Sequence, residues 1–472
     1  MANYSIKDIC NDFWKLEREL NLFENKVSGI YFWELVRLEV YNSIINTILP
    51  YGNAHTVKLK LRDKIKAIPM YAFNSFTKSA LKRTRKEILI FDHPRKVLVN
   101  NQYIDIYTNH LVKELEGKCN YEIFESDYLR KHWTNRDEAN RYYLDCFYLY
   151  TLKDRLLTKV YVSTGEDQLL KKVEDSIYRL FNCRVNLKPI IISRIKDFKL
   201  RYSLYDRILK LKRPKKIYLV VSYGYHALIA AAKDNGIETI EIQHGTITKY
   251  HLGYSFPNVE KEKVHYFPDN LYLFGEYWGR NVIMPLEEEG KKIYGFPYLK
   301  SKINTYLSTE KNKRQVLFLS QGTIGKQLSE IAFNFATHFK EHQVIYKLHP
   351  GEYDRWKTEY PALVNSIKLN NFEVIDNGDI DLYKLQAKSE YQVGVNSTAI
   401  FEGLMFSCKT ILINLPGIEY MEDLINEGYA ILKNKNEISN FLNINNELNR
   451  SNLVKGDIFY GLERATRKEV LI

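Results

Sequence analysis

Apolar and polar positions alternate along the chain in two different ways, and the change falls near residue 86. Before it, stretches such as FWKLERELNLFENK and YFWELVRLEVYNSIINTIL place apolar residues three and four positions apart, which is the period of an amphipathic helix. Few helix-breaking residues interrupt this pattern before Pro50. Residues 1–85 are therefore predicted to form a helical preface.

From Glu87 on, short apolar runs are followed by amphipathic stretches. Strands are predicted at EILIF, KIYLVVS (216–222) and TIEIQ (239–243), and helices at 105–116 and 135–181. This alternation favours an α/β fold with a parallel sheet and crossover helices. We assign residues 86–300 to a first α/β domain.

A second alternating series begins after the polar, lysine-rich segment 301–314, which is predicted to be a linker. Residues 315–472 then form a second α/β domain, whose last helix is allowed to return to the first domain. Two such domains around a cleft describe many nucleotide-using enzymes, although neither G-x-G-x-x-G after a strand nor GxxxxGK[ST] is present. The elements expected in the second domain are QVLFLS (315–320), a helix near 326–340, QVIYKLHP (343–350), FEVID (372–376), YQVGV (391–395), a helix from Thr398 and KTILINL (409–415).

The composition is that of a folded protein, with 45% apolar and 27% charged residues in 472. No apolar run reaches the ~18–20 residues of a membrane-spanning helix, and the start lacks the order of a signal peptide, so we expect a cytoplasmic protein. The five cysteines show no CxxC or Cys/His spacing, which predicts neither disulfides nor a metal site.

The net charge of +12 suggests an anionic partner. Lysine and arginine gather in two stretches mixed with apolar residues, 55–89 and 188–216. A basic amphipathic helix can lie on an anionic membrane, here the inner face of the plasma membrane, but the same pattern also describes a solvated face over the core. A nucleic-acid partner is not expected, because no recognised binding motif accompanies the charge.

Polar clusters follow the predicted strands, at the edge where open α/β sheets bind their ligands. In the first domain they are Tyr223 and His226 in SYGYH, and Gln243, His244, Lys249 and His251 in QHGTITKYH. In the second domain they are Ser320, Gly322 and Thr323; Lys347, His349 and Pro350; and Asn396, Ser397, Thr398 and Glu402.

Three of these clusters suit an anion. Ser397 or Thr398 can cap a helix whose free amide groups favour a phosphate, or can serve as a plain N-cap. His349 can donate to a phosphate or can be an ordinary histidine at the end of a strand. Gly322 and Thr323 fit either a backbone nest or a tight turn.

In the order SxGT, KLHPGE, NSTAxFE, the clusters of the second domain resemble the donor half of bacterial GT-B glycosyltransferases that build capsule, lipopolysaccharide or teichoic-type polymers. EIQHGTITKYHLGY likewise resembles the QHG element of several of these transferases. The resemblance covers about residues 217–430. It implies two Rossmann-like domains facing across a cleft, with the nucleotide-sugar donor in 315–472 and the acceptor in 86–300. The basic amphipathic segments would keep the preface close to the membrane.

The resemblance also implies roles for single residues. His349 would bind the donor phosphate with Ser397 and Thr398, Glu402 would bind ribose hydroxyls, and the backbone near Lys347 and Ser320 would recognise the base. The acceptor would meet the first-domain residues Tyr223, His226, Gln243, Lys249 and His251. The resemblance makes His244 the general base, with a structural histidine as its alternative and Asp105 as the runner-up base.

The predicted function is transfer of a sugar from a nucleotide-sugar, CMP- or UDP-linked, to a lipid-linked or oligosaccharide acceptor in capsule or lipopolysaccharide O-antigen synthesis. No further cofactor is expected, and no metal is expected either, since no DxD-type pair occurs in an appropriate strand-end loop. One alternative is transfer of glycerol or ribitol phosphate from a CDP-linked donor, which uses similar elements. Another is a non-catalytic basic protein that binds nucleic acid or membrane.

Overall fold

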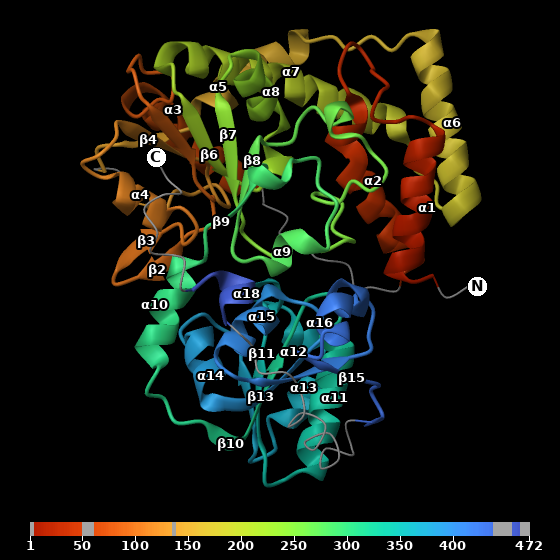
Figure 1. Cartoon of the computed structure of the whole chain (residues 1–472), viewed down its shortest axis with the longest axis vertical. Coiled ribbons are helices and arrows are strands. Elements are labelled where there is room, and N and C mark those ends of the chain that lie inside the picture. The colour runs from red at the N-terminus through yellow and green to blue at the C-terminus, as the bar shows by residue number, and fades with distance from the viewer. Residues whose placement is uncertain (1–3, 50–60, 135–137, 438–455, 463–472) are drawn as a thin grey trace.

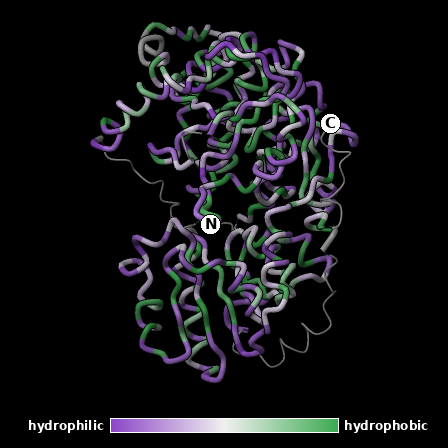
Figure 2. Tube along the Cα trace, turned by 90° about the vertical axis from the view of Figure 1, so that its left-hand side faces the viewer, coloured by the Kyte–Doolittle hydropathy of each residue, from purple (hydrophilic) through white to green (hydrophobic). Residues whose placement is uncertain are grey.

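The structure is a computed structural model that describes residues 4–49, 61–134, 138–437 and 456–462. Figure 1 shows two α/β domains, one above the other, with α10 (Pro297–Tyr306) running between them. Apolar residues concentrate in the strands and hydrophilic residues at the turns and the outer surface (Figure 2). No helix within the described ranges is long and apolar enough to span a membrane.

Three helices precede the first sheet. A buried ion pair, Arg37 Nε to Glu17 Oε1 at 2.6 Å, ties the first two together. These two lie on one side of the first domain, whereas the third lies on the other side, next to α5 (Figure 1). The preface thus has two separate parts. The three helices are α1 (Ile6–Glu19), α2 (Phe32–Ile48) and α3 (Leu61–Thr77).

The first domain is built on a seven-stranded sheet in the order β5-β4-β1-β6-β7-β8-β9, in which all neighbours are parallel. Its strands are β1 (Ile88–Phe91), β4 (Tyr121–Glu125), β5 (Arg141–Tyr143), β6 (Lys216–Val220), β7 (Glu238–Ile242), β8 (Asn270–Leu273) and β9 (Lys291–Ile293), and a separate antiparallel hairpin joins β2 (Val97–Val99) to β3 (Gln102–Ile104). Its helices are α4 (Asn109–Leu115), α5 (Cys146–Leu157), α6 (Thr164–Phe181), α7 (Leu187–Lys212), α8 (His226–Asp234) and α9 (Tyr277–Arg280), with 3-10 turns η1 (Ser222–Gly224), η2 (Lys261–Lys263) and η3 (Glu288–Gly290).

The second domain has a six-stranded parallel sheet in the order β12-β11-β10-β13-β14-β15. Its strands are β10 (Asn312–Leu319), β11 (Gln343–Lys347), β12 (Phe372–Ile375), β13 (Ser389–Gly394), β14 (Lys409–Ile413) and β15 (Ile431–Lys433). Its helices are α11 (Gly325–His338), α12 (Trp356–Glu359), α13 (Pro361–Ser366), α14 (Leu382–Lys388), α15 (Thr398–Met405) and α16 (Glu422–Asn426), with 3-10 turns η4 (Pro350–Glu352) and η5 (Ile418–Met421).

The predicted fold class, two Rossmann-like α/β domains of GT-B type behind a helical preface, is confirmed by these two parallel sheets. One predicted helix is wrong: 135–181 contains β5, α5 and α6, and residues 135–137 lie outside the described ranges. A three-residue strand carries too little periodicity to stand out from an amphipathic stretch. The segment 301–314 holds the second half of α10 and the first residues of β10.

A short C-terminal helix, α18 (Gly456–Tyr460), packs on the first domain between the two sheets (Figure 1). Trp278 Nε1 in α9 donates to the Phe459 carbonyl at 2.6 Å. Phe401 in α15 packs against Trp278, with ring centroids 4.6 Å apart. This aromatic cluster holds α15 against the first domain.

Most of the basic stretch 188–216 lies in α7, which packs on the core. Lys212 is fully buried, and its Nζ lies 2.6 Å from Glu122 Oε2. Several exposed cations of α7 are paired as well, for example Arg201 Nε with Asp197 Oδ2 at 2.7 Å. This pairing favours the solvated-face interpretation for α7. In the other basic stretch, Lys58 and Lys60 lie outside the described residues.

Candidate active site

A cavity of about 420 Å³ opens between the two domains. It lies where polar segments at the carboxyl ends of strands from both sheets face each other, as expected for α/β proteins. The first domain and α2 line it with Leu38, Tyr41, Asn42, Thr246, Thr248, Tyr250, His251 and Leu252, and the second domain with Gln321, His349, Asn396, Ser397, Thr398, Tyr420 and Met421.

Gln243 shapes the turn that follows β7. Its buried amide accepts a hydrogen bond from the Phe274 backbone N–H at 2.7 Å and donates one to the Gly245 carbonyl at 2.7 Å. Both functions of the amide are thus used inside the first domain. Gln243 therefore holds the turn that presents His244.

His244 lies on this turn between two tyrosines. Its Nε2 is 3.3 Å from the Tyr223 hydroxyl, and its Nδ1 is 3.5 Å from the Tyr254 hydroxyl. Burial, together with the nearby imidazoles of His251 and His93, lowers the pKa of His244 to about 3. At neutral pH the ring is uncharged and can accept a proton.

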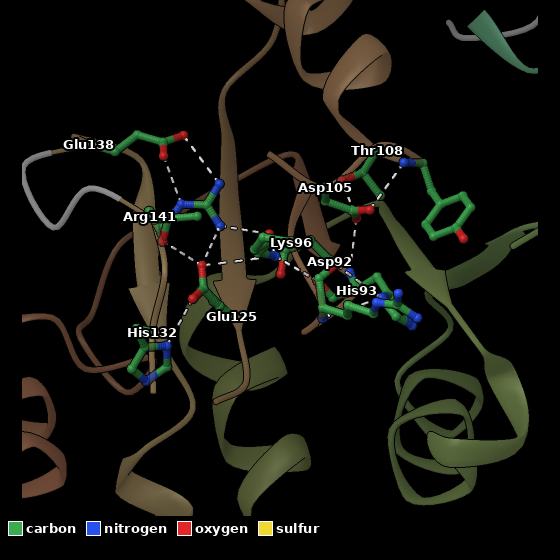
Figure 3. A network of polar contacts seen from close by, with 12 residues as sticks. Asp92, His93, Lys96, Asp105, Thr108, Glu125, His132, Glu138 and Arg141 are labelled. Atoms are coloured by element: carbon green, nitrogen blue, oxygen red, sulfur yellow. Dashed lines mark hydrogen bonds and ion pairs between the residues drawn. The ribbon is translucent and has the colours of Figure 1, made fainter. Parts of the chain in front are cut away.

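Asp105 orders the loop that carries His93 (Figure 3). Its buried carboxylate accepts hydrogen bonds from the His93 N–H at 2.9 Å, the Tyr107 N–H at 3.0 Å and the Thr108 hydroxyl at 2.7 Å. The His93 ring lies beside His244, with centroids 6.3 Å apart. Because both carboxylate oxygens are engaged, the geometry gives Asp105 a positioning role at this loop.

A network of buried charges holds the ends of β1, β4 and β5 next to this loop (Figure 3). Arg141 Nη1 contacts Asp92 Oδ2 at 2.6 Å and Glu125 Oε2 at 3.0 Å, and Lys96 Nζ contacts Asp92 Oδ2 at 2.6 Å. His132 bonds Glu125 at 2.9 Å and Asp145 at 2.9 Å. Burial opposes its protonation, but these carboxylates raise the pKa of His132 to about 9.

In the second domain, His349 is held by the turn that it starts. Its backbone N–H donates to Glu352 Oε2 at 2.7 Å, and its Nδ1 accepts from the Gly351 N–H at 3.1 Å. Burial and the charges of Arg95, Lys347 and Arg355 lower the pKa of His349. The neutral ring therefore carries its proton on Nε2, which leaves one N–H donor for a ligand.

Glu352 is a residue that the sequence analysis missed. Its buried carboxylate also accepts from the Ser320 hydroxyl at 2.9 Å and the Tyr360 hydroxyl at 2.7 Å. Ser320 is thereby turned into the domain. The signal was the His-x-x-Glu spacing of a capping box, in which the side chain of the fourth residue reaches back to the backbone N–H of the first.

Two arginines were also missed. Arg95 follows β1 in the sequence FDHPRK, which is another polar cluster at a strand end. It is exposed, its charge acts on His349 and Tyr353 of the other domain, and no partner of its guanidinium is seen among the described residues. Arg355 Nη2 donates to the Gly322 carbonyl at 3.1 Å and so joins the 320–323 turn to the His349 turn.

Helix α15 begins at the cavity. Ser397 is its N-cap and accepts from the Ala399 N–H at 3.2 Å, while Asn396 Nδ2 donates to the Gly417 carbonyl at 2.9 Å. Thr398 lies next to the QHG turn of the first domain. One turn further on, burial raises the pKa of Glu402 to about 7, with a smaller contribution from Asp381.

The other predicted residues lie apart from the cavity wall. Lys249 joins the domains, with its Nζ 2.7 Å from Glu422 Oε2. Lys347 donates to the Tyr353 hydroxyl at 2.6 Å, and burial lowers the pKa of Lys347 to about 8. Pro350 is the first residue of η4, and Thr323 lies in the turn before α11. His226 begins α8.

No protein-family model matches the sequence, and no curated protein matches it. Among solved structures, UDP-GlcNAc 2-epimerase from Methanocaldococcus jannaschii is similar with a TM-score of 0.45 and 12% identity, over 80% of this chain and 98% of that one. The UDP-GlcNAc 2-epimerase from Neisseria meningitidis bound to UDP-GlcNAc gives 0.47 and 11%, over 80% and 97%. The glycotransferase of kitacinnamycin gives 0.43 and 10%, over 81% and 97%.

Proposed function

We propose that the protein is a glycosyltransferase that moves a sugar from a nucleotide-activated donor to a growing bacterial surface glycan, such as capsule or lipopolysaccharide O-antigen. One observation carries the proposal. Hydrogen-bond donors from the second domain converge on a cavity between the domains, and the neutral His244 of the first domain lies on the turn that faces Thr398 in the wall of that cavity. The choice of a surface glycan rests on the resemblance of the strand-end motifs.

The donor's phosphates suit the second-domain wall of the cavity. The first turn of α15 offers backbone N–H groups and the Thr398 hydroxyl, and His349 offers Nε2–H. Arg95 adds a positive charge from the opposite domain. Such donors stabilise the negative charge that develops on a leaving nucleotide.

His244 is the proposed general base. Its neutral imidazole can take the proton from the acceptor hydroxyl as that oxygen attacks the anomeric carbon of the sugar and the nucleotide leaves. Without a bound ligand, the pKa of His244 is low, at about 3. A bound diphosphate raises it, because a nearby negative charge favours the protonated ring.

The exposed face of α3 supports a location at the membrane surface, where lipid-linked acceptors lie. Ile65, Ile68, Phe73 and Phe76 are 57%, 53%, 55% and 86% exposed and share one face of the helix. Exposed basic residues lie near both ends of this face, namely Arg62, Lys64, Lys66, Lys82, Arg83 and Arg85. We propose that α3 lies in the interface of an anionic bilayer.

A thermal-shift series with CMP, CDP, UDP, GDP and dTDP tests the proposal, since a ligand at 100 times its dissociation constant adds about 2.7 kcal/mol of stability. His349→Ala should weaken the binding of the stabilising nucleotide by about 1.5–3 kcal/mol, and the exposed His338→Ala in the same domain should leave it unchanged. The proposal fails if no nucleotide stabilises the protein. Phosphorus analysis of the product separates transfer of a sugar from transfer of a polyol phosphate.

A further inference from the structure

A second cavity, of about 510 Å³, adjoins the first and shares Leu38 and Asn42 with it. It is a groove between one face of α2 and one face of α7. Its α2 wall runs from Leu35 to Asn46, which is about 16 Å at 1.5 Å per residue. The groove is therefore built largely by helices outside the strand core, and it is long enough for a short oligosaccharide.

The inner end of the groove is the segment 223–227. Tyr223 belongs to this end, and its hydroxyl is 3.3 Å from His244 Nε2. Tyr223 therefore links this end of the groove to the imidazole of His244. The shared wall at Asn42 brings a molecule in the groove to the edge of the cavity between the domains.

The groove carries balanced charge. Arg194 Nε pairs with Glu39 Oε2 at 2.8 Å across the two helices, and Arg201 pairs with Asp197 within α7. Each guanidinium thus already has a carboxylate, so the walls give no net attraction to an anion. This separates the groove from the first cavity, where the charge of Arg95 acts on His349 and no such partner of Arg95 is seen among the described residues.

The remaining lining suits a neutral sugar. Asn42, Ser43 and Asn46 supply groups that both donate and accept hydrogen bonds, as sugar hydroxyls require. Tyr223 and Tyr225 are partly exposed and supply aromatic surface for the apolar faces of sugar rings. Ligand sites commonly combine aromatic walls with a few placed polar groups in this way.

We propose that the groove between α2 and α7 binds a neutral oligosaccharide, the acceptor of the transferase, and delivers its terminal hydroxyl to His244. The inference rests on the proposed function, and it adds the class of acceptor and the path along which the acceptor arrives. It gives the N-terminal helix α2 a role in substrate binding.

Saturation-transfer NMR tests the groove without nucleotide. The probes are neutral trisaccharides of glucose, galactose, mannose and N-acetylglucosamine. At least one of them should bind the wild type, and Asn46→Trp, which fills the outer end of the groove, should weaken that binding at least tenfold. Gln102→Trp is the matched control, because Gln102 is also exposed but lines a different cavity, near β3. The affinity of Gln102→Trp for the same trisaccharide should stay within twofold of wild type.

Failure to bind any of these trisaccharides overturns the inference, and so does an equal loss in both variants. Arg194→Met is a second test that adds no bulk, and it should weaken the same trisaccharide at least threefold. If instead the proposed function is wrong, a different result is expected. In that case no nucleotide stabilises the protein, whereas the trisaccharide still binds and still responds to Asn46→Trp.

Discussion

Gly245 and Thr398 come from different domains, yet a β-carbon at Gly245 would lie only 3.7 Å from Thr398 Oγ1. The QHG turn of the first sheet and the start of α15 thus face each other directly. Because 3.7 Å is an ordinary van der Waals distance, one methyl group fits between them, whereas a longer side chain would compete for space with a ligand that lies between the two turns.

Gly245→Ala should therefore keep wild-type nucleotide affinity, whereas Gly245→Leu should weaken it at least tenfold, which is about 1.4 kcal/mol. Isothermal calorimetry with the stabilising nucleotide gives both values. Equal affinities for alanine and leucine at this position would show that the ligand does not lie between the two turns.

His244→Ala should lower turnover by about a hundredfold or more, which is the usual scale for a lost general base. Donor affinity should stay near wild type, since the first domain holds this residue. Steady-state kinetics with saturating donor and acceptor measure the first effect, and calorimetry the second. Tyr223→Phe removes only the hydroxyl next to the imidazole and should lower turnover clearly less than His244→Ala does. Near-normal turnover of His244→Ala would remove the base assignment.

His132 should make stability depend on pH in the alkaline range. Its pKa is about 9 in the folded protein against 6.5 in the unfolded chain. The stabilisation, on the order of 3 kcal/mol, is complete below pH 6.5 and is lost as the pH rises through 9. His132→Gln should lower the urea midpoint strongly at pH 6 and little at pH 9.5. The same decrease at both pH values would contradict the charged histidine.

Phe73→Ser with Phe76→Ser should release the protein from anionic vesicles. Each phenylalanine that is buried in the bilayer interface contributes about 1.5–3 kcal/mol, so binding should fall at least tenfold. Co-sedimentation with phosphatidylglycerol vesicles measures this change. Leu307→Ser, at a residue that is 79% exposed elsewhere on the surface, is the control. If wild type and the double variant sediment alike, α3 does not contact the bilayer.

The periodicity of the sequence predicted the two parallel sheets. The pattern of apolar and polar residues in a buried strand can be told from that of an amphipathic helix within a few residues. It failed where elements are short, as at β5 (Arg141–Tyr143). It also gave no sign that α3 is separated from α1 and α2, since the position of a helix depends on the tertiary contacts that it makes.

At the candidate site, the rule that α/β sheets bind ligands at the carboxyl ends of their strands identified the right segments. It did not predict the direction of each side chain. His349 and Thr398 line the cavity, whereas Gln243 and Ser320 turn inward, because Phe274 N–H and Glu352 offer them buried partners. Those partners lie 31 and 32 residues further along the chain, beyond the reach of local pattern. The binding and catalytic roles of all these residues stay predictions.

The position of α18 affects the order in which the molecule can be completed during synthesis. A β-carbon at Gly275 would overlap the backbone of Ile458 and Phe459, so this glycine leaves space for a segment that the ribosome makes more than 180 residues later. Until then, the Trp278 indole N–H lacks its acceptor. The first domain therefore emerges with an unfinished aromatic core, and it gains its last packing layer only after the whole second sheet has been translated.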